Sequence, residues 1–308
     1  MHRRQFLRAA AASPLLASSG LVRAVEDDDR PPVVDTHLHC FAGPDDPRFP
    51  YHPDGPYQPE MPAPPERLLR LMAEAGVDYA VVVHPEPYQD DHRYLEHCVD
   101  VGGEKLKGTC LFFADEPGSI DRMTALVRRR EGQIVAARIH AYAPDRLPPF
   151  GTPELRALWE QIGELGLAVQ LHFEPRYAPG FEPLIEAFPG TTVIIDHLGR
   201  PFQGTPEEHA VVVGWSRFPN TIMKLSSLPE RGQYPHRDIA PVNRSLTDAY
   251  GPDRLIYGGG FNAEATPESY RAYRERLRSY LTHLTAEQQA KVLGGNAARL
   301  FGFGAGGY

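Results

Sequence analysis

The chain has 308 residues, with 32 basic and 40 acidic side chains, so its formal net charge is −8 when the histidines are neutral. Its composition is 42% hydrophobic and 23% charged, which excludes disordered, collagen-like and disulfide-scaffold proteins. The negative balance argues against the basic face that phosphate binding needs, so we expect a small-molecule partner and no nucleic acid. Three cysteines form neither a disulfide framework nor a paired metal motif.

The first 24 residues have the parts of an export signal. Arg3 and Arg4 are followed by a short stretch of small and apolar residues, and Val22-Arg23-Ala24 resembles a cleavage site. The paired arginines resemble a twin-arginine signal, which exports folded proteins, here to the periplasm. The alternative is a basic amphipathic start to a cytoplasmic protein. We expect a signal peptide over 1–24, a linker over 25–30 and a mature charge of 28 − 40 = −12. No later stretch approaches the ~20 apolar residues of a membrane span.

From Pro31 onward, short apolar runs alternate with segments of helical periodicity. The strand-like runs are Val33–His39, Tyr79–His84, Leu106–Phe113, Ile134–His140, Leu167–Phe173, Thr192–His197, Thr221–Ser226 and Leu255–Gly259. Eight such alternations predict a single α/β domain over 31–303, a TIM-like (β/α)8 barrel, with a tail at 304–308. An open doubly wound sheet is the alternative, but no strand-to-helix turn carries a glycine fingerprint.

The connection after the first strand is rich in proline. Nine prolines lie in it: Pro44, Pro47, Pro50, Pro53, Pro56, Pro59, Pro62, Pro64 and Pro65. A structureless loop of about 20 residues is uncommon and usually functional, and in a barrel it lies on the C-terminal face, where active sites are built. Its Arg48, Tyr51, His52 and Tyr57 are candidate substrate contacts, and a rigid surface loop is the equal alternative.

Strand alternation predicts which polar side chains face the barrel interior. In the first strand Asp35, His37 and His39 share one face, and neighbours on that face are about 6–7 Å apart, so both imidazoles can reach one ion. In the later strands the apolar residues alternate with the polar ones and are predicted to face the helices. The polar residues predicted to face inward there are Arg138, His140, Gln170, His172, Glu174, Asp196, Lys224 and Ser226.

Six segments in order resemble the amidohydrolase-related family. They are Val33–His39, Val169–His172, Asp196–Pro201, Lys224–Ser226, Tyr250–Leu255 and Gly295–Phe301. The resemblance covers nearly all of the mature chain and is nearest to the pyrone-dicarboxylate lactonase-like and carboxymuconate-semialdehyde decarboxylase-like subgroup. It implies a distorted (β/α)8 barrel with its site on the C-terminal face.

The resemblance also implies roles for individual residues. His37, His39 and His172 fall on the positions that bind one divalent metal ion, usually zinc, in the metal-dependent members. His197 falls on the residue that polarises the substrate or a bound water, and Arg138 on one that holds a substrate carboxylate. The remaining candidate substrate contacts are Tyr51, His52, His140, Lys224 and Ser226.

One position departs from the family pattern. The family ends its eighth strand with Gly-Ser-Asp-Trp-Pro, whose Asp is the general base, whereas this chain has Gly258-Gly259-Gly260-Phe261-Asn262. Gly260 therefore stands where the base is expected, and glycine neither binds a metal nor accepts a proton. Asn262 shares its face but an amide is no base. The residues that could substitute are Glu264, Glu174 and His140.

Four functions follow from this pattern. The first is a metal-dependent hydrolase of a small cyclic ester, cyclic amide or carboxylated substrate. The second is a metal-free lactonase that uses the histidines as electrophiles, and the third is a decarboxylase in the same scaffold. The fourth is a non-catalytic periplasmic binding barrel, which the loss of the base at Gly260 suggests. The substrate and the oligomeric state stay open.

Overall fold

The fold is known from a computed structural model that describes residues 30–142, 147–228 and 238–304. The expected signal peptide, most of the linker and most of the tail lie outside these ranges, so export by a twin-arginine signal stays a prediction. Among the helices of the described ranges, none is long and apolar enough to cross a membrane. The three cysteines, Cys40, Cys98 and Cys110, are buried free thiols.

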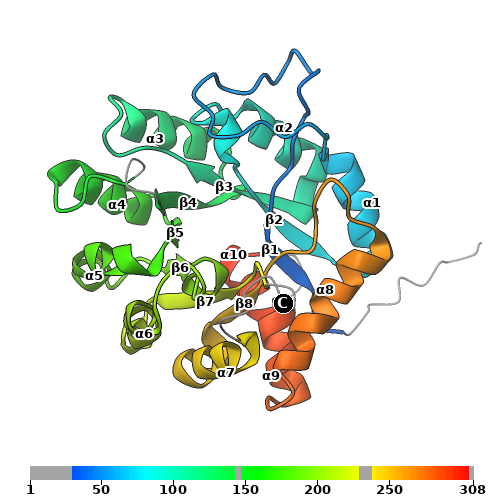
Figure 1. The fold of residues 1–308 in the computed structure, drawn as a ribbon. Coiled ribbons are helices and arrows are strands. Elements are labelled where there is room, and N and C mark those ends of the chain that lie inside the picture. Colours follow the sequence, from blue (N-terminus) through cyan, green and yellow to red (C-terminus); the bar gives the residue numbers. More distant parts are fainter. Residues whose placement is uncertain (1–29, 143–146, 229–237, 305–308) are drawn as a thin grey trace, which may run out of the picture. The chain divides into compact units, whose positions relative to one another are not determined.

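From Pro31 the chain forms one barrel unit (Figure 1). Its eight strands are hydrogen-bonded to one another in chain order, and every pair is parallel. This arrangement confirms the predicted (β/α)8 class. The strands are β1 (Val34–Leu38), β2 (Tyr79–Val83), β3 (Leu106–Leu111), β4 (Ile134–Ala141), β5 (Ala168–Phe173), β6 (Val193–Ile195), β7 (Thr221–Leu225) and β8 (Leu255–Tyr257).

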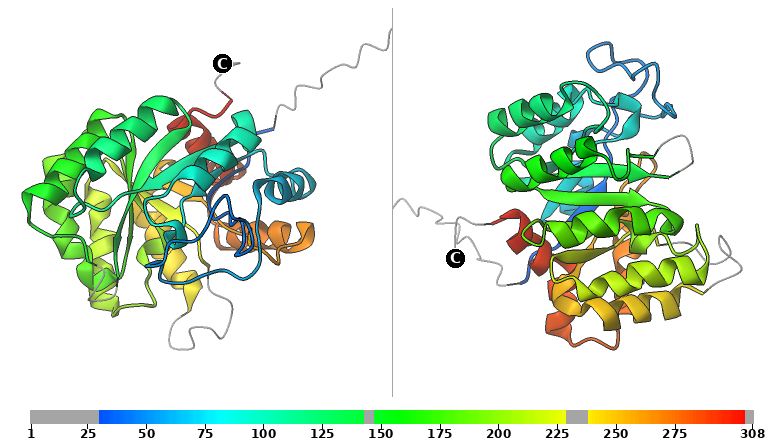
Figure 2. Two further views of the ribbon diagram at one scale, coloured as in Figure 1. Left: turned by 90° about the horizontal axis from the view of Figure 1, so that it is seen from above. Right: turned by 90° about the vertical axis from the view of Figure 1, so that its left-hand side faces the viewer.

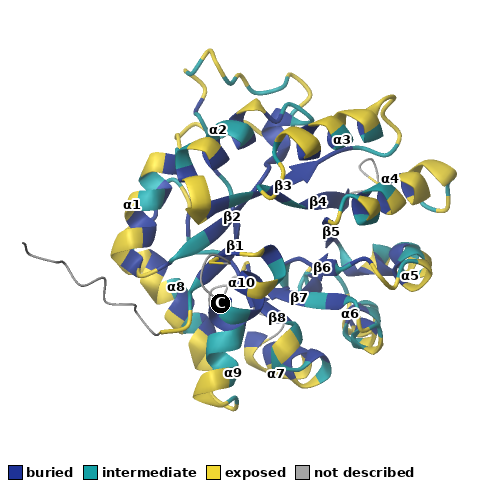
Figure 3. Cartoon of the chain, turned by 180° about the vertical axis from the view of Figure 1, so that it is seen from behind, coloured by how far each residue is buried: buried dark blue, intermediate teal, exposed yellow. Residues whose placement is uncertain are grey.

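The helices surround the strands and expose their outer faces, as Figure 3 shows. Several begin at a threonine followed by proline: Thr152, Thr205 and Thr266 each accept a hydrogen bond from the backbone N–H three residues on. The helices are α1 (Pro65–Ala75), α2 (Arg93–Gly102), α3 (Ser119–Arg129), α4 (Pro153–Glu164), α5 (Ala178–Ala187), α6 (Pro206–Gly214), α7 (Ile239–Tyr250), α8 (Pro267–Tyr280), α9 (Ala286–Ala290) and α10 (Asn296–Phe301).

The barrel interior is layered. An apolar layer lies at the amino-terminal ends of the strands, where Phe301 and Phe303 pack against it, and Figure 2 shows α10 (red) at that end. This layer contains Val34, Val81, Ala136, Ala168, Ile194 and Ile256. Two residues further along β4, β5 and β6 come the polar side chains of Arg138, Gln170 and Asp196, as strand alternation predicts.

The first strand differs from the prediction at Asp35. Its pairing with β2 shifts register between Asp35 and Leu38, which is the signature of a bulge. Val34 therefore lies in the inner apolar layer, whereas Asp35 accepts a hydrogen bond from the hydroxyl of Tyr270 on α8, at 2.6 Å. The prediction that Asp35 shares the face of His37 is wrong, because the irregularity resets the alternation before the histidines.

Side chains bridge the seam between β8 and β1. Thr36 Oγ1 donates to the carbonyl of Tyr257 at 2.7 Å, and Asp35 Oδ1 accepts from the N–H of Gly259 at 2.7 Å. A Cβ at Gly258 would lie 2.8 Å from the Cβ of His37, so only glycine lets the end of β8 approach β1 this closely. The seam thereby fixes the position of His37.

The segment between α9 and α10 is a π-helical turn, Lys291–Gly295, that packs against β1 and β8. At Gly294 a Cβ would lie 1.8 Å from the carbonyl oxygen of Pro32, whereas at Gly295 its nearest neighbour would be 3.7 Å away. The glycine at position 294 is thus required by close backbone approach.

We expect Gly294→Ala to destabilise the barrel by about 1–3 kcal/mol, because the backbone of Pro32 must move to admit the methyl group. The matched control is Gly295→Ala, which adds a methyl in open helical backbone and should be neutral or stabilise by up to ~1 kcal/mol. Urea unfolding of both variants measures the difference. Equal midpoints would show that the turn does not pack on β1 as described.

Candidate active site

A buried carboxylate, Asp196, holds two cations just above the apolar layer. Its Oδ2 accepts from Arg138 Nε at 3.0 Å, Arg138 Nη2 at 2.9 Å and Gln170 Nε2 at 3.0 Å. Its Oδ1 lies 3.0 Å from Lys224 Nζ. Burial raises the pKa of Asp196, but Lys224 and Arg138 outweigh it and hold that pKa well below its usual range. Asp196 is therefore ionised at neutral pH.

This ionic cluster of Arg138, Gln170, Asp196 and Lys224 joins strands around the barrel. Its members come from β4, β5, β7 and the end of β6, and Lys224 Nζ also donates to the carbonyl of Thr36 in β1 at 3.0 Å. Arg138 is 3% exposed and Lys224 is fully buried. Both predicted site residues thus lie beneath the cavity, with their N–H groups directed at Asp196.

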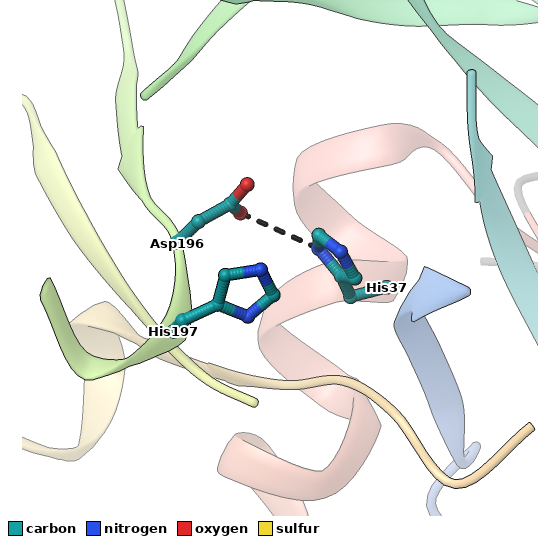
Figure 4. A group of neighbouring side chains, drawn as sticks. All are labelled: His37, Asp196 and His197. Atoms are coloured by element: carbon teal, nitrogen blue, oxygen red, sulfur yellow. Dashed lines mark ion pairs between the residues drawn. The ribbon is translucent and has the colours of Figure 1, made fainter. Parts of the chain in front are cut away.

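Two histidines lie directly above Asp196 (Figure 4). His37 Nδ1 is 3.5 Å from Asp196 Oδ1, and the rings of His37 and His197 are 4.3 Å apart. Within the described residues, these three offer ligand atoms that all lie within 4.8 Å of one another. Burial lowers the pKa of both imidazoles well below the usual value, so they are neutral at pH 7.

Hydrogen bonds set the tautomer of His197. The backbone N–H of His197 donates to Ser226 Oγ at 3.3 Å, and that hydroxyl lies 2.9 Å from His197 Nδ1. Ser227 Oγ lies 2.8 Å from the same Nδ1, and when these hydroxyls donate to Nδ1 the ring proton lies on Nε2. His197 can then act as a neutral hydrogen-bond donor to a carbonyl oxygen, as predicted for it. Ser226 lies behind His197 and orients it.

The other two predicted metal ligands have different partners. His39 Nδ1 donates to the carbonyl of Val83 at 2.7 Å, and burial lowers its pKa to about 4. His172 Nδ1 shares a hydrogen bond of 3.1 Å with His140 Nδ1, and its Nε2 contacts a guanidinium N–H of Arg200. Because arginine only donates, the Nε2 lone pair of His172 is occupied.

A cavity of about 720 Å³ opens above the histidines. Its floor is formed by His37, His39 and His197, and its walls come from the proline-rich loop and the segment after β8. That volume suits a small-molecule ligand. The other lining residues are Leu38, Phe41, Pro59, Glu60, Met61, Ser226, Ser227, Gly259, Gly260, Phe261, Asn262, Ala263 and Tyr273.

The turn that carries His197 has an unusual backbone. His197, Leu198 and Arg200 have positive φ angles of 56°, 58° and 52°, and Gly199 between them has 67°. Each non-glycine residue in this conformation costs about 1 kcal/mol or more, and such residues cluster at functional sites. The turn directs Arg200 toward His172 and over the ring of Tyr142, at 5.7 Å.

The segment after β8 is shaped around glycine. Gly260 has a φ angle of +113°, and a Cβ there would lie 2.6 Å from the ring of Tyr270. An aspartate at this position would displace that ring, so the family's carboxylate has no room here. Asn262 lines the cavity, but its Oδ1 already accepts from the N–H of Glu264 at 2.8 Å.

The proline-rich loop borders the site through residues other than those predicted. Tyr51 donates through its hydroxyl to the carbonyl of Pro59 at 3.1 Å, and His52 accepts from the N–H of Asp54. Neither lines the 720 Å³ cavity, whereas Glu60 and Met61 do. The loop thus borders the cavity through Glu60 and Met61, and substrate contact by Tyr51 and His52 stays a prediction. Proline content indicates stiffness, not which side chain faces inward.

The remaining predicted contact, His140, lies apart from the large cavity. It is 8% exposed, its Nδ1 is 3.4 Å from Glu86 Oε1, and it lines a separate cavity of about 260 Å³. The sequence interpretation assigned no role to Arg200, although it quoted the motif that contains it. Positive φ angles at His197, Leu198 and Arg200, on both sides of Gly199, cannot be recognised from residue types alone.

The donor groups do not fit the predicted divalent ion. Both nitrogens of His172 have protein partners, His140 and Arg200, so an ion bound by His37, His39 and His172 would have to displace Arg200 from Nε2. The alternative set of His37, Asp196 and His197 has a carboxylate whose charge already faces two buried cations at about 3 Å. A dication placed there would be repelled by both.

Comparisons with known proteins identify the family of this chain. Residues 34–303 match the family model described as Amidohydrolase. A 2-pyrone-4,6-dicarboxylate hydrolase from Comamonas testosteroni is 29% identical over 287 residues, which cover 87% of this chain and 90% of that protein. An L-fucono-1,5-lactonase from Burkholderia ambifaria is 27% identical over 250 residues, covering 75% and 82%.

Solved structures share the fold. A Pseudomonas putida protein, provisionally named a 2-pyrone-4,6-dicarboxylic acid hydrolase, superposes with a TM-score of 0.73 at 22% identity, covering 89% of this chain and 99% of its own. An amidohydrolase from Burkholderia multivorans with bound zinc superposes with a TM-score of 0.69 at 16% identity, covering 88% and 99%.

Removing the negative charge of Asp196 should destabilise the barrel strongly. We expect Asp196→Asn to cost about 3–5 kcal/mol, because Arg138 and Lys224 are left buried without a counter-charge. The control, Asp248→Asn, removes one partner of an exposed pair with Arg244 and should cost less than ~1 kcal/mol. Chemical unfolding measures both, and similar losses would contradict the proposed dependence on Asp196.

Proposed function

The chain belongs to the amidohydrolase family, and from this premise we propose that it opens the ester ring of a small lactone that carries a carboxylate. The observation that carries the proposal is the charge under the cavity. Asp196 contributes −1 and its two partners, Arg138 and Lys224, contribute +1 each, so this ionic cluster alone carries −1 + 2 = +1 beneath three neutral imidazoles. The buried Asp35, whose pKa is raised by burial to about 6, adds negative charge on the β1 side. The positive charge of the cluster favours an anion.

Arg200 supports an anionic substrate. It lies beside a recess of about 90 Å³ that shares His197 and Ser227 with the large cavity. A substrate carboxylate in that recess would meet a guanidinium, the group best suited to hold it. The two curated relatives act on cyclic esters by name, and one of those, 2-pyrone-4,6-dicarboxylate, carries two carboxylates.

The chemistry assigned to His197 is polarisation of the ester carbonyl. Its Nε2–H points away from the serine that fixes Nδ1, and a neutral imidazole donor stabilises negative charge as it develops on the carbonyl oxygen. His39 keeps Nε2 as an acceptor because its Nδ1–H is bound to Val83, so it can position a water or a substrate hydroxyl.

We propose that this hydrolysis does not depend on a divalent ion. The zinc in the Burkholderia multivorans structure belongs to that protein. In this chain Arg200 contacts Nε2 of His172, and two cations contact Asp196. Both features disfavour the binding of a zinc ion at this site. The metal-free lactonase is thus the better supported of the alternatives, ahead of the metal-dependent hydrolase.

We expect the purified mature chain to hydrolyse carboxylated lactones in preference to a neutral lactone. The carboxylated members of the panel are 2-pyrone-4,6-dicarboxylate and the aldaric acid lactone in which the methyl group of L-fucono-1,5-lactone is replaced by a carboxylate. The uncharged members are L-fucono-1,5-lactone itself and δ-valerolactone. Titration of released acid gives kcat/KM for each. One extra charged hydrogen bond predicts at least about a tenfold preference for the carboxylated compounds.

A second variant tests the assigned anion contact. Arg200→Gln removes the guanidinium charge but keeps a polar side chain, and it should remove the preference for carboxylated lactones, mainly through KM. Faster hydrolysis of δ-valerolactone than of every carboxylated member would contradict the proposal. Tight binding of a carboxylated lactone without any turnover would instead establish the binding barrel that Gly260 suggests.

A further inference from the structure

Hydrolysis of a lactone requires a group that takes a proton from water, and Gly260 cannot supply it. The two buried carboxylates nearest the cavity floor are already engaged. Asp35 accepts from Tyr270, Gly259 and His37, and Asp196 binds Arg138, Gln170 and Lys224. Neither Asp35 nor Asp196 lines the 720 Å³ cavity, so neither is placed to replace the missing base.

The substitutes suggested by the sequence are also poorly placed. Glu174 is paired with Arg176, and His140 lines the separate 260 Å³ cavity. Glu264 does not line the large cavity, and exposure does not separate it from Glu60, because both residues are exposed. Among the residues that the structure describes around that cavity, the one carboxylate belongs to Glu60, on the loop after β1.

The backbone on both sides of Glu60 is held in place. The carbonyl of the preceding Pro59 accepts from the Tyr51 hydroxyl, whose ring in turn packs against Tyr88 at 5.2 Å. Three residues on, Ala63 pairs with Phe41 through two hydrogen bonds of 2.8 and 3.1 Å. With Pro59 and Pro62 restricting the chain as well, Glu60 is carried by a stiff segment, not by a freely moving loop.

The carboxylate of Glu60 is available to act. Within the described ranges it makes no ion pair or hydrogen bond, and it faces the same cavity as His39 and His197. We propose that Glu60 is the general base of this site and replaces, from the proline-rich loop, the carboxylate that Gly260 lacks. This inference rests on the proposed lactone hydrolysis.

In the reaction, the Glu60 carboxylate accepts one proton from a water molecule while the water oxygen bonds to the lactone carbonyl carbon. The carbonyl π pair moves to its oxygen, which accepts a hydrogen bond from His197 Nε2. On collapse that pair re-forms the C=O bond, the ring C–O bond breaks, and the leaving oxygen takes the proton from Glu60. One lactone and one water give one hydroxy acid, and Glu60 is again a carboxylate.

The test uses the full mature chain and whichever lactone of the panel it opens fastest. We expect Glu60→Gln to lower kcat by at least about 100-fold with KM changed by less than about threefold, because the base acts in the transition state. Glu60→Asp should retain part of the activity. Added formate should raise kcat of Glu60→Ala, since it supplies a carboxylate in the vacated space.

Two comparisons decide the outcome. Glu66→Gln, the same change at an exposed position in the first turn of α1, should leave kcat unaltered. Full activity of Glu60→Gln, or loss of activity in Glu264→Gln instead, overturns the assignment while leaving lactone hydrolysis intact. Absence of hydrolysis by the unmodified chain on every lactone overturns the proposed function and, with it, this inference.

Discussion

The ion pairs of Asp196 determine how the rest of the site is built. One carboxylate at the end of β6 binds Arg138 of β4 and Lys224 of β7, and Lys224 reaches β1. Ion pairs this deeply buried contribute little net stability by themselves, but losing one partner is costly, so they specify one arrangement of the strands. That arrangement places His37 and His197 side by side above Asp196.

The same ion pairs decide what kind of ligand the cavity accepts. Burial keeps the imidazoles of His37 and His197 neutral, and the two cations on Asp196 support our proposal that the cavity binds an anion. A family member that retains a carboxylate at the end of β8 has a further negative group for a metal ion, whereas Gly260 has none. We therefore propose that this amidohydrolase-family hydrolase combines a site for an anion with a base, Glu60, on the proline-rich loop.

Much of this could be predicted from the sequence. The barrel followed from alternating apolar runs, and parity placed Arg138, Asp196 and Lys224 inside because their strands are regular. Strand alternation gave the wrong face for Asp35, because the register shift between Asp35 and Leu38 cannot be recognised from residue types. The partners of a buried charge could not be predicted either: strand alternation places Arg138 inside the barrel but does not show that it donates its N–H groups to Asp196. The sequence showed that Gly260 replaces the expected base. It did not show that the ring of Tyr270 occupies the space that a side chain at position 260 would need.

The zinc content of the active protein distinguishes a site organised for an anion from one organised for a dication. The mature chain is loaded with excess zinc, passed over a desalting column, and measured by mass spectrometry together with its lactone hydrolysis before and after chelation. We expect less than one zinc ion per chain and unchanged hydrolysis, because Lys224 and Arg138 repel a cation beside Asp196. One tightly held zinc ion per chain, with activity lost on chelation and restored by zinc, would contradict it.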